Sequence, residues 1–305
     1  MMLSEVPLGL VVAGCVVAAA CGGKPLRKKV LLIGLDGVRV DILQEAYTPN
    51  IDALIENGVY RDDAETRPPT VSGPGWSSML MGVWSDKHLV TSNNFTGNDY
   101  ADYPDFLTRL ELTYSTLNTF AVLDWPPLGT TSSGGPLLSD AIDFKINIDG
   151  DELGYAVADS QSITAAVRYI EDQDPDAVFV YIGNIDVVGH ESGSLSAEYR
   201  AAVEVADGQV GQLMRAVERR RTRDQEDWLI LVSTDHGRRD DGGHGGSSKK
   251  ERTIFYLASG TSISHAKLQT APQIVDIAVT ALEHMGVDVD AAWRLDGKVV
   301  GIKGR

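Results

Sequence analysis

Continuous apolar runs of strand length alternate with helical patterns along this chain, and this alternation limits the folds open to it. The apolar runs are Val30–Leu35, Ala177–Gly183, Trp228–Ser233 and Thr253–Ala258. Such uninterrupted runs are typical of strands buried on both faces. Helices are predicted at 48–58, 104–112, 159–173, 197–220 and 274–282, with another from Gly73–Gly75 to Gly82. The pattern predicts an α/β fold with a mostly parallel sheet sandwiched between helices.

Local signals mark some of the element boundaries. Thr48 is a candidate N-cap for the first predicted helix, Pro49 suits its first turn, and Gly58 follows its end. Residues 95–158 are rich in Gly, Asn and aromatic side chains and show little regular periodicity. We expect substrate-selecting loops or a small cap in this segment.

Composition excludes several classes of protein. With 305 residues, 43% of them hydrophobic, the chain has enough apolar material for one sizeable core. The 27 Lys and Arg against 43 Asp and Glu give a net charge of −16, which opposes the binding of duplex nucleic acid. A small anionic substrate is compatible with this charge if bound metal ions supply positive charge at the site.

The N-terminus resembles a lipoprotein signal rather than part of the fold. Leu8–Ala20 is an apolar run too short for a typical membrane span, and small residues precede both Cys15 and Cys21. We expect residues 1–23 to form a signal or anchor segment lipidated at Cys21, and residues 24–305 to form the catalytic domain. The alternatives are Cys15 as the lipidated residue, or a buried or anchoring N-terminal helix. The lipidated form would be extracytoplasmic, in the periplasm or at the cell surface.

Three of the apolar runs end within a few residues of a carboxylate. Asp36 follows the first, Asp186 the second and Asp235 the third. Because ligands bind beyond the carboxyl ends of strands in parallel α/β sheets, these distant acids are expected to converge. Each one taken alone has the alternative of a helix-capping or turn Asp.

Histidines strengthen the case for a metal site at these strand ends. The chain has six, and His190, His236 and His244 lie beside Asp186 or Asp235. Imidazole and carboxylate together suit Zn or Mn. Two divalent ions would offset three buried carboxylates and leave positive charge for a phosphate.

Ser72 is the nucleophile candidate and Asn93 the candidate oxygen binder. Ser72 precedes a predicted helix, whose N-terminal N–H groups and dipole favour alkoxide and phosphate. Thr70 is the competing nucleophile, and a simple N-cap is the alternative role for Ser72. Asn93 offers an amide donor for a non-bridging phosphoryl oxygen, with an ordinary turn Asn as its alternative.

Taken together and in order, these segments resemble the alkaline phosphatase superfamily, and within it the type I phosphodiesterase/nucleotide pyrophosphatase family. The motifs are G-L-Asp36-G, T-P-N-I-D-A-L at 48–54, P-T-V-Ser72-G-P-G-W-S-S-M-L-M-G, Asp186-x-x-G-His190, S-T-Asp235-His236-G and His244-G. The resemblance implies an alkaline phosphatase-like fold with two zinc ions. It places Asp186, His190 and His244 at one zinc, and Asp36, Asp235, His236 and the nucleophile Ser72 at the other.

The resemblance also implies a reaction. It overlays the family nucleophile on Ser72, its phosphate-binding Asn on Asn93, and a frequent His on His88, to which we assign no role. Ser replaces the usual Thr nucleophile, and Gly75-Trp76 replaces the usual Asn-His. We expect a two-metal phosphodiesterase or nucleotide pyrophosphatase that acts on a small phosphate ester through a phosphoseryl intermediate.

Two alternatives remain open. The first is a phosphomonoesterase or phosphonate hydrolase with the same metals. The second is a non-catalytic lipoprotein that binds a phosphate ester, which retention of Ser72 with all six metal-ligand candidates argues against.

Overall fold

A seven-stranded sheet organises the residues that the computed structural model describes, 25–304. The predicted anchor, with Cys15 and Cys21, lies outside the described residues. The spatial order of the strands is β2-β7-β6-β1-β5-β3-β4. Their bounds are β1 Arg27–Leu35, β2 Gly58–Glu65, β3 Thr119–Leu123, β4 Phe144–Asn147, β5 Ala177–Ile182, β6 Glu226–Ser233 and β7 Thr253–Ser259.

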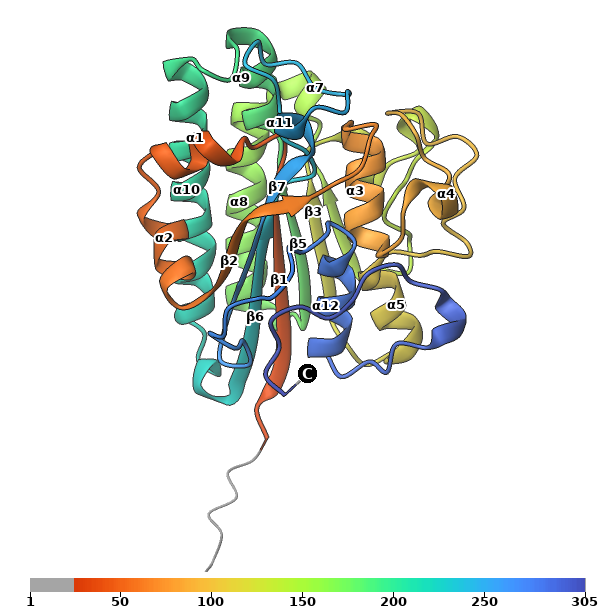
Figure 1. Ribbon diagram of the computed structural model, residues 1–305. Coiled ribbons are helices and arrows are strands. Elements are labelled where there is room, and N and C mark those ends of the chain that lie inside the picture. The colour runs from red at the N-terminus through yellow and green to blue at the C-terminus, as the bar shows by residue number, and fades with distance from the viewer. Residues whose placement is uncertain (1–24, 305) are drawn as a thin grey trace, which may run out of the picture.

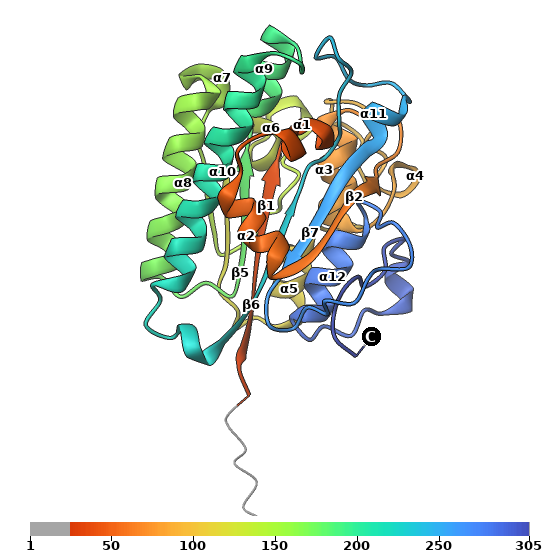
Figure 2. The ribbon, with the colours of Figure 1, turned by 60° about the vertical axis from the view of Figure 1, so that its left-hand side comes forward.

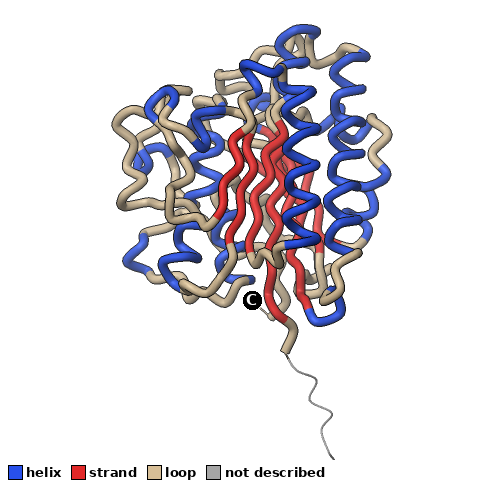
Figure 3. The backbone as a smooth tube through the Cα atoms, turned by 180° about the vertical axis from the view of Figure 1, so that it is seen from behind, coloured by secondary structure: helices blue, strands red, loops and turns tan. Residues whose placement is uncertain are grey.

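Helices cover both faces of this sheet (Figure 1). Their bounds are α1 Val40–Glu45, α2 Pro49–Glu56, α3 Ser72–Met81, α4 Ser85–His88, α5 Phe106–Thr113, α6 Pro126–Gly129, α7 Gly150–Leu153, α8 Tyr155–Asp172, α9 Asn184–Ser192, α10 Ala197–Glu218, α11 Lys249–Arg252 and α12 Asp276–His284. Figure 2 shows α8 and α10 on one side of the sheet and α3 and α12 on the other, and Figure 3 shows the strands between these layers from behind. Within the described residues, no helix is both long and apolar enough to cross a membrane.

The sheet is mostly parallel, as predicted. β1 lies between β5 and β6 and is parallel to both, and β3 is parallel to β5 and β4. β7 alone pairs antiparallel, with β6 and with β2. Leu35 is paired with Ile182, and Gly34 with Ser233, so the carboxyl ends of the three central strands lie level. Side chains that follow these ends therefore share one edge of the sheet.

Alternate residues of β1 supply two apolar cores. Val30 and Leu32 pack in the core under α3, α5 and α12, whereas Leu31 and Ile33 pack in the core under α8 and α10. All four side chains are buried. A strand with helices on both faces must be apolar on both, which explains its unbroken apolar run.

Several elements differ from the sequence-based expectation. Residues 95–158 were expected to form loops or a small cap, but they contribute β3 and β4 to the sheet as well as loops. β2 was not predicted because its sequence, G-V-Y-R-D-D-A-E, is charged at four of eight positions and lacks the continuous apolar run of the central strands. Thr48 is the N-cap of α2 by position, yet its side chain makes no capping hydrogen bond. Asp207 of α10 instead accepts from the backbone N–H groups of Asn50 and Ile51.

Candidate metal centre and nucleophile

The three predicted strand-end acids converge at one edge of the sheet. Asp36 follows β1, Asp186 lies in the first turn of α9 just after β5, and Asp235 follows β6. The Asp36 N–H donates to the carbonyl oxygen of Ile182 at 2.9 Å, and the Gly37 N–H donates to Asp235 Oδ1 at 3.1 Å. Backbone pairing at the ends of the central strands thus fixes where these carboxylates lie.

One group of candidate ligands consists of Asp186, His190 and His244, whose donor atoms lie within 4.8 Å of one another. Asp186 Oδ2 is 3.4 Å from His190 Nε2, and Asp186 Oδ1 is 3.6 Å from His244 Nε2. The Nε2 atoms of the two histidines are 2.8 Å apart. Asp186 and His190 are four residues apart in α9, a spacing that puts them on one helix face.

A second group consists of Asp36, Asp186 and His236. His236 Nε2 is 3.7 Å from Asp36 Oδ1 and 3.3 Å from Asp235 Oδ2. Asp186 therefore faces both groups, whereas the family resemblance assigns it to one. Asp235 lies against His236, and its other oxygen accepts the hydrogen bond from Gly37.

Backbone carbonyls set the tautomers of two of the histidines. His236 Nδ1 lies 3.0 Å from the Gly237 oxygen, and His244 Nδ1 lies 2.8 Å from the Thr70 oxygen. Because a carbonyl oxygen only accepts, each Nδ1 carries the proton and each Nε2 presents a lone pair. A hydrogen bond of this kind from the second ring nitrogen is typical of metal-binding histidines.

Burial perturbs the pKa values of these acids. Burial and the nearby charge of Asp186 raise the pKa of Asp36 to about 7. Burial and the charge of Asp36 likewise raise the pKa of Asp235. Burial also acts to raise the pKa of Asp186, but hydrogen bonding to His190 and the charge of Arg238 hold it below the usual value. The site concentrates more negative charge than the surrounding protein neutralises.

The donor set fits divalent cations. Asp36 Oδ1 and Asp235 Oδ2 are buried and have no hydrogen-bond donor among residues 25–304. Burying a carboxylate oxygen without a partner is costly, and a cation removes that cost. Imidazole nitrogen and carboxylate oxygen are the ligands that zinc takes in catalytic sites.

Ser72 lies at the start of α3 and faces this centre. Its Oγ is 3.3 Å from His236 Nε2, and 6% of the residue is exposed. The Thr70 hydroxyl is engaged by backbone groups instead, since Oγ1 donates to the Gly246 oxygen and accepts from the Gly245 N–H, both at 3.0 Å. This geometry favours Ser72 over Thr70 as the nucleophile.

Asn93 lies beside the same helix N-terminus. Its Oδ1 accepts from the Gly73 N–H at 2.8 Å, and the residue is exposed. With Oδ1 engaged, the amide NH₂ group is the part of the side chain available to an anionic ligand. The structure therefore places Asn93 against Gly73, the residue that follows Ser72.

Two aromatic residues that sequence reasoning missed bind Asp36. Trp76 Nε1 donates to Asp36 Oδ2 at 3.0 Å, and the Tyr181 hydroxyl donates to the same oxygen at 2.6 Å. A Cβ on Gly34 would overlap the Trp76 ring, and a Cβ on Gly75 would lie 3.0 Å from Asp235 Cβ. The Gly75-Trp76 departure from the family pattern thus has a structural role: it admits the loop after β6 and supplies a donor to Asp36.

A buried acid pair beside the centre was also missed. Asp124 directly follows β3 and is fully buried, and neither of its oxygens has a donor among the described residues. Burial and the charge of Asp159 raise its pKa. Asp159 accepts from the backbone N–H groups of Gly183 at 2.9 Å and Asn184 at 3.2 Å, where α9 begins. The sequence could have predicted Asp124, because in T-F-A-V-L-Asp124 an apolar run is followed by an Asp, as it is at Asp36.

His88, which the resemblance left without a role, is a structural residue. Its Nδ1 accepts from the Val90 N–H at 3.1 Å, so Nε2 carries the proton and donates to Ser78 Oγ at 3.0 Å. Burial lowers its pKa to about 4. The neutral ring links α3 to the segment that leads toward Asn93.

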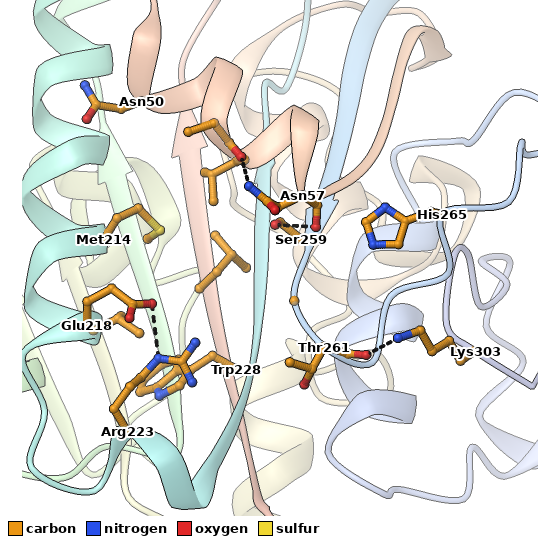
Figure 4. Close-up of a pocket in the computed structure, with 15 residues that line it drawn as sticks. Asn50, Asn57, Met214, Glu218, Arg223, Trp228, Ser259, Thr261, His265 and Lys303 are labelled. Atoms are coloured by element: carbon orange, nitrogen blue, oxygen red, sulfur yellow. Dashed lines mark hydrogen bonds and ion pairs between the residues drawn. The ribbon is translucent and has the colours of Figure 1, made fainter.

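A cavity of about 630 Å³ lies away from these residues. Figure 4 shows Asn50 and Met214 on one side of it and His265 and Lys303 on the other. Trp228, near the start of β6, also lines it, and five residues of strand at about 3.3 Å each separate Trp228 from Ser233, at the end of β6 that precedes Asp235, by roughly 17 Å. The cavity is therefore separate from the candidate centre.

The sheet order, the flanking helices and the strand-end Asp/His cluster define an alkaline phosphatase-like fold. A family model described as type I phosphodiesterase/nucleotide pyrophosphatase matches residues 30–241. The chain belongs to this family, which confirms the resemblance stated from the sequence.

Individual comparisons agree with this assignment. Human ectonucleotide pyrophosphatase/phosphodiesterase family member 7 is 24% identical over 254 residues, which cover 75% of this chain and 53% of the relative. Murine ectonucleotide pyrophosphatase/phosphodiesterase 5, solved as an inactive variant with AMP, superposes with a TM-score of 0.65 at 14% identity, covering 85% of this chain and 95% of that one. A putative sulfatase from Bacteroides thetaiotaomicron gives a TM-score of 0.70 at 13% identity, covering 90% and 74%. The chain spans about half the length, or less, of the first curated relatives it matches.

Proposed function

We propose that this protein hydrolyses a phosphodiester or pyrophosphate bond in a small substrate such as a nucleotide, through a phosphoseryl intermediate on Ser72. One observation carries the proposal: Ser72 Oγ lies 3.3 Å from His236 Nε2, beside Asp36 and Asp235, each of which has one buried oxygen without a donor among the described residues. The comparison with a murine relative that binds AMP supports a nucleotide-like substrate. The predicted lipid anchor at Cys21 would place this activity outside the cytoplasm.

The centre would hold two divalent cations, with zinc as the proposed metal. Asp186, His190 and His244 would hold one, and Asp36, Asp235 and His236 would hold the other together with Ser72. When bound, such ions lower the pKa of a coordinated hydroxyl and stabilise negative charge on phosphoryl oxygens.

The reaction proceeds by two displacements at phosphorus. The Ser72 hydroxyl loses its proton to solvent, and Oγ forms a bond to phosphorus while the bond to the leaving-group oxygen breaks. The leaving-group oxygen takes up a proton from solvent and departs. A water oxygen then attacks phosphorus from the opposite side and gives up a proton to solvent, the phosphorus–Oγ bond breaks, and Oγ regains a proton. Asn93 and the N-terminal N–H groups of α3 bind the non-bridging oxygens in both steps. Two inversions give net retention of configuration.

The positions of Arg39 and Arg67 favour diester cleavage over the alternative of monoester or phosphonate cleavage. Arg39 forms ion pairs with Asp41 at 2.7 Å and Asp240 at 2.5 Å. The Arg67 guanidinium stacks over the Trp84 ring at 4.0 Å. These two arginines are thus engaged elsewhere, whereas a dianionic monoester calls for a further cation.

The test combines metal analysis with a substrate panel. Purified protein is assayed for bound metal by mass spectrometry and for hydrolysis of bis-nitrophenyl phosphate, nitrophenyl phosphate and nitrophenyl sulfate at matched metal loading. We expect two equivalents of zinc and the highest kcat/KM with the diester. Ser72→Ala should keep both metals and lose turnover, whereas Ser77→Ala, in the same helix, should keep activity. An active Ser72→Ala protein would exclude the phosphoseryl route, and tight ester binding without product release would favour the binding-only alternative.

A further inference from the structure

Arg238 is a fully buried arginine in the loop between the two histidines that follow β6. Its guanidinium donates to three different segments. Nε donates to the Gly37 oxygen at 3.1 Å, Nη1 donates to the Gly242 oxygen, and Nη2 contacts Asp186 Oδ1. One planar group with fixed donor directions therefore joins the loop after β1, helix α9 and the loop after β6.

Each of these three segments carries candidate metal ligands. Gly37 follows Asp36, Asp186 is itself a ligand candidate, and Gly242 lies two residues before His244. A change in the position of the guanidinium would therefore displace ligands of both groups.

Two glycines leave the space that the guanidinium occupies, and a third allows the loop after β6 to pack against α9. A Cβ on Gly189, one residue before His190, would overlap Arg238 Nη1 and Cζ, and a Cβ on Gly37 would lie 2.9 Å from Nη2. A Cβ on Gly242 would overlap the Gly189 carbonyl oxygen. The site is thus shaped around this side chain rather than merely containing it.

We propose that Arg238 is a positioning residue that fixes Asp186 and the two ligand-bearing loops for metal binding. This inference rests on the proposed metal centre. Its physical basis is that the rigid planar guanidinium, held by the Gly37 and Gly242 carbonyl oxygens through Nε and Nη1, presents Nη2 to Asp186 in a fixed direction, which a point charge would not do. With Oδ1 oriented by Arg238, Oδ2 is directed toward His190.

Charge and geometry predict opposite effects when Arg238 is removed. A positive charge beside Asp186 repels a divalent cation, so a purely Coulombic role predicts tighter metal binding in Arg238→Met. A positioning role predicts weaker binding, because the carboxylate and the loops lose their fixed orientation. Loss of partners that orient metal ligands typically costs about 10- to 100-fold in metal affinity.

The experiment measures zinc binding to metal-free full-length protein by calorimetry, and the visible spectrum of the cobalt-loaded protein. We expect about 10-fold or greater weakening in both Arg238→Met and Arg238→Lys, with an altered cobalt spectrum. Gly189→Ala should show the same loss with Arg238 still present, because the added methyl group displaces the guanidinium. Tighter or unchanged zinc binding in Arg238→Met would overturn the proposal, as would unchanged binding in Arg238→Lys.

A matched control separates folding from positioning. Arg220 is also buried and bonded to carboxylates and a carbonyl, namely Asp174, Glu226 and the Ile170 oxygen, but it lies at the opposite end of β6. Arg220→Met should lose thermal stability while keeping wild-type zinc affinity. If both arginine variants lost affinity equally, the effect would be general and the proposal would fail. If wild-type protein bound no zinc, the proposed function would fail as well.

Discussion

Gly73 lies between Ser72 and the segment that carries Asn93, and replacing it with alanine tests whether these two residues act together. Its N–H donates to Asn93 Oδ1 at 2.8 Å. A Cβ at this position would lie 2.2 Å from the Ser92 carbonyl oxygen and 3.2 Å from Asn93 Cα. Both of these atoms belong to the backbone, so the added methyl group cannot be accommodated by a side-chain rotation.

The expected losses of stability and of catalytic efficiency in Gly73→Ala follow from these distances. Relief of the overlap to 3.0 Å requires the Ser92 oxygen to withdraw by at least about 0.8 Å, which carries Asn93 away from Ser72. Overpacking of this kind destabilises a protein by roughly 1–3 kcal/mol. A displacement of about 1 Å of a positioning group lowers catalysis by about 10²-fold, so we expect kcat/KM for a diester to fall by that order.

The assay pairs steady-state hydrolysis of bis-nitrophenyl phosphate with thermal unfolding. Gly208→Ala is the matched control, because it makes the same substitution inside α10 with open space around the new methyl group. That variant should gain roughly 0.5–1 kcal/mol from helix propensity and keep full activity. A Gly73→Ala protein with lower stability but wild-type kcat/KM would refute the catalytic role of Asn93, and unchanged stability would refute the packing argument itself.

Three further predictions concern buried groups around the centre. Burial lowers the pKa of His88 from 6.5 to about 4, so the His88 ring binds a proton more readily in the unfolded chain than in the folded one. The free energy of unfolding should therefore fall by about 3 kcal/mol as pH falls from 6.5 through 4. Urea unfolding at several pH values should show a smaller fall over this range for His88→Gln. The pKa of Asp124 is raised by burial and by Asp159, so its carboxyl destabilises the fold increasingly as pH rises through its folded pKa. Asp124→Asn places an amide NH₂ donor toward Asp159 and should therefore be more stable than wild type at pH 8. This gain in stability should disappear below pH 3.8, and a pH-independent difference between the two proteins would contradict this account. Trp76→Phe removes the Nε1–H donor to Asp36 and should weaken zinc binding by about 10-fold in calorimetry, whereas equal affinity would show that Tyr181 orients this carboxylate alone.

The main features of the centre could be predicted because they follow from topology. Asp36, Asp186 and Asp235 each come after a buried apolar run, and parallel strands bring such positions to one edge. No side-chain detail is needed for that step. The histidines then indicate a metal site, because the same loops and the turns of α9 hold them close to these acids.

The partners of these ligands could not be predicted by the same reasoning. Tyr181 lies inside an apolar strand and Trp76 inside a buried helix, and nothing in their local sequence shows that both donate to Asp36. Arg238 lies in a glycine-rich loop, where its burial depends on space left by Gly37 after β1 and Gly189 in α9. Such contacts are set by tertiary packing, whereas periodicity reports only which face of an element is apolar.

Edge strands escaped prediction for a related reason. β4 has only four residues, F-K-I-N, and its two end residues are exposed. β2 is charged at four of its eight positions, which its place at the opposite edge of the sheet allows because a single strand borders it. The continuous apolar run that identifies a central strand is a consequence of helices covering both faces, and neither edge strand is enclosed in that way.

Charge balance connects the buried acids to the choice of substrate. Asp36, Asp186 and Asp235 contribute three negative charges when ionised, and Arg238 offsets one of them through Asp186. Two divalent cations would change the net charge of the site from about −2 to about +2, and ionisation of Ser72 would reduce this net charge to about +1. That value matches the single negative charge of a phosphodiester, whereas a dianionic monoester would leave the buried site with excess negative charge. With Arg39 and Arg67 engaged elsewhere, the charges that would hold two metal ions would also favour the proposed diester substrate.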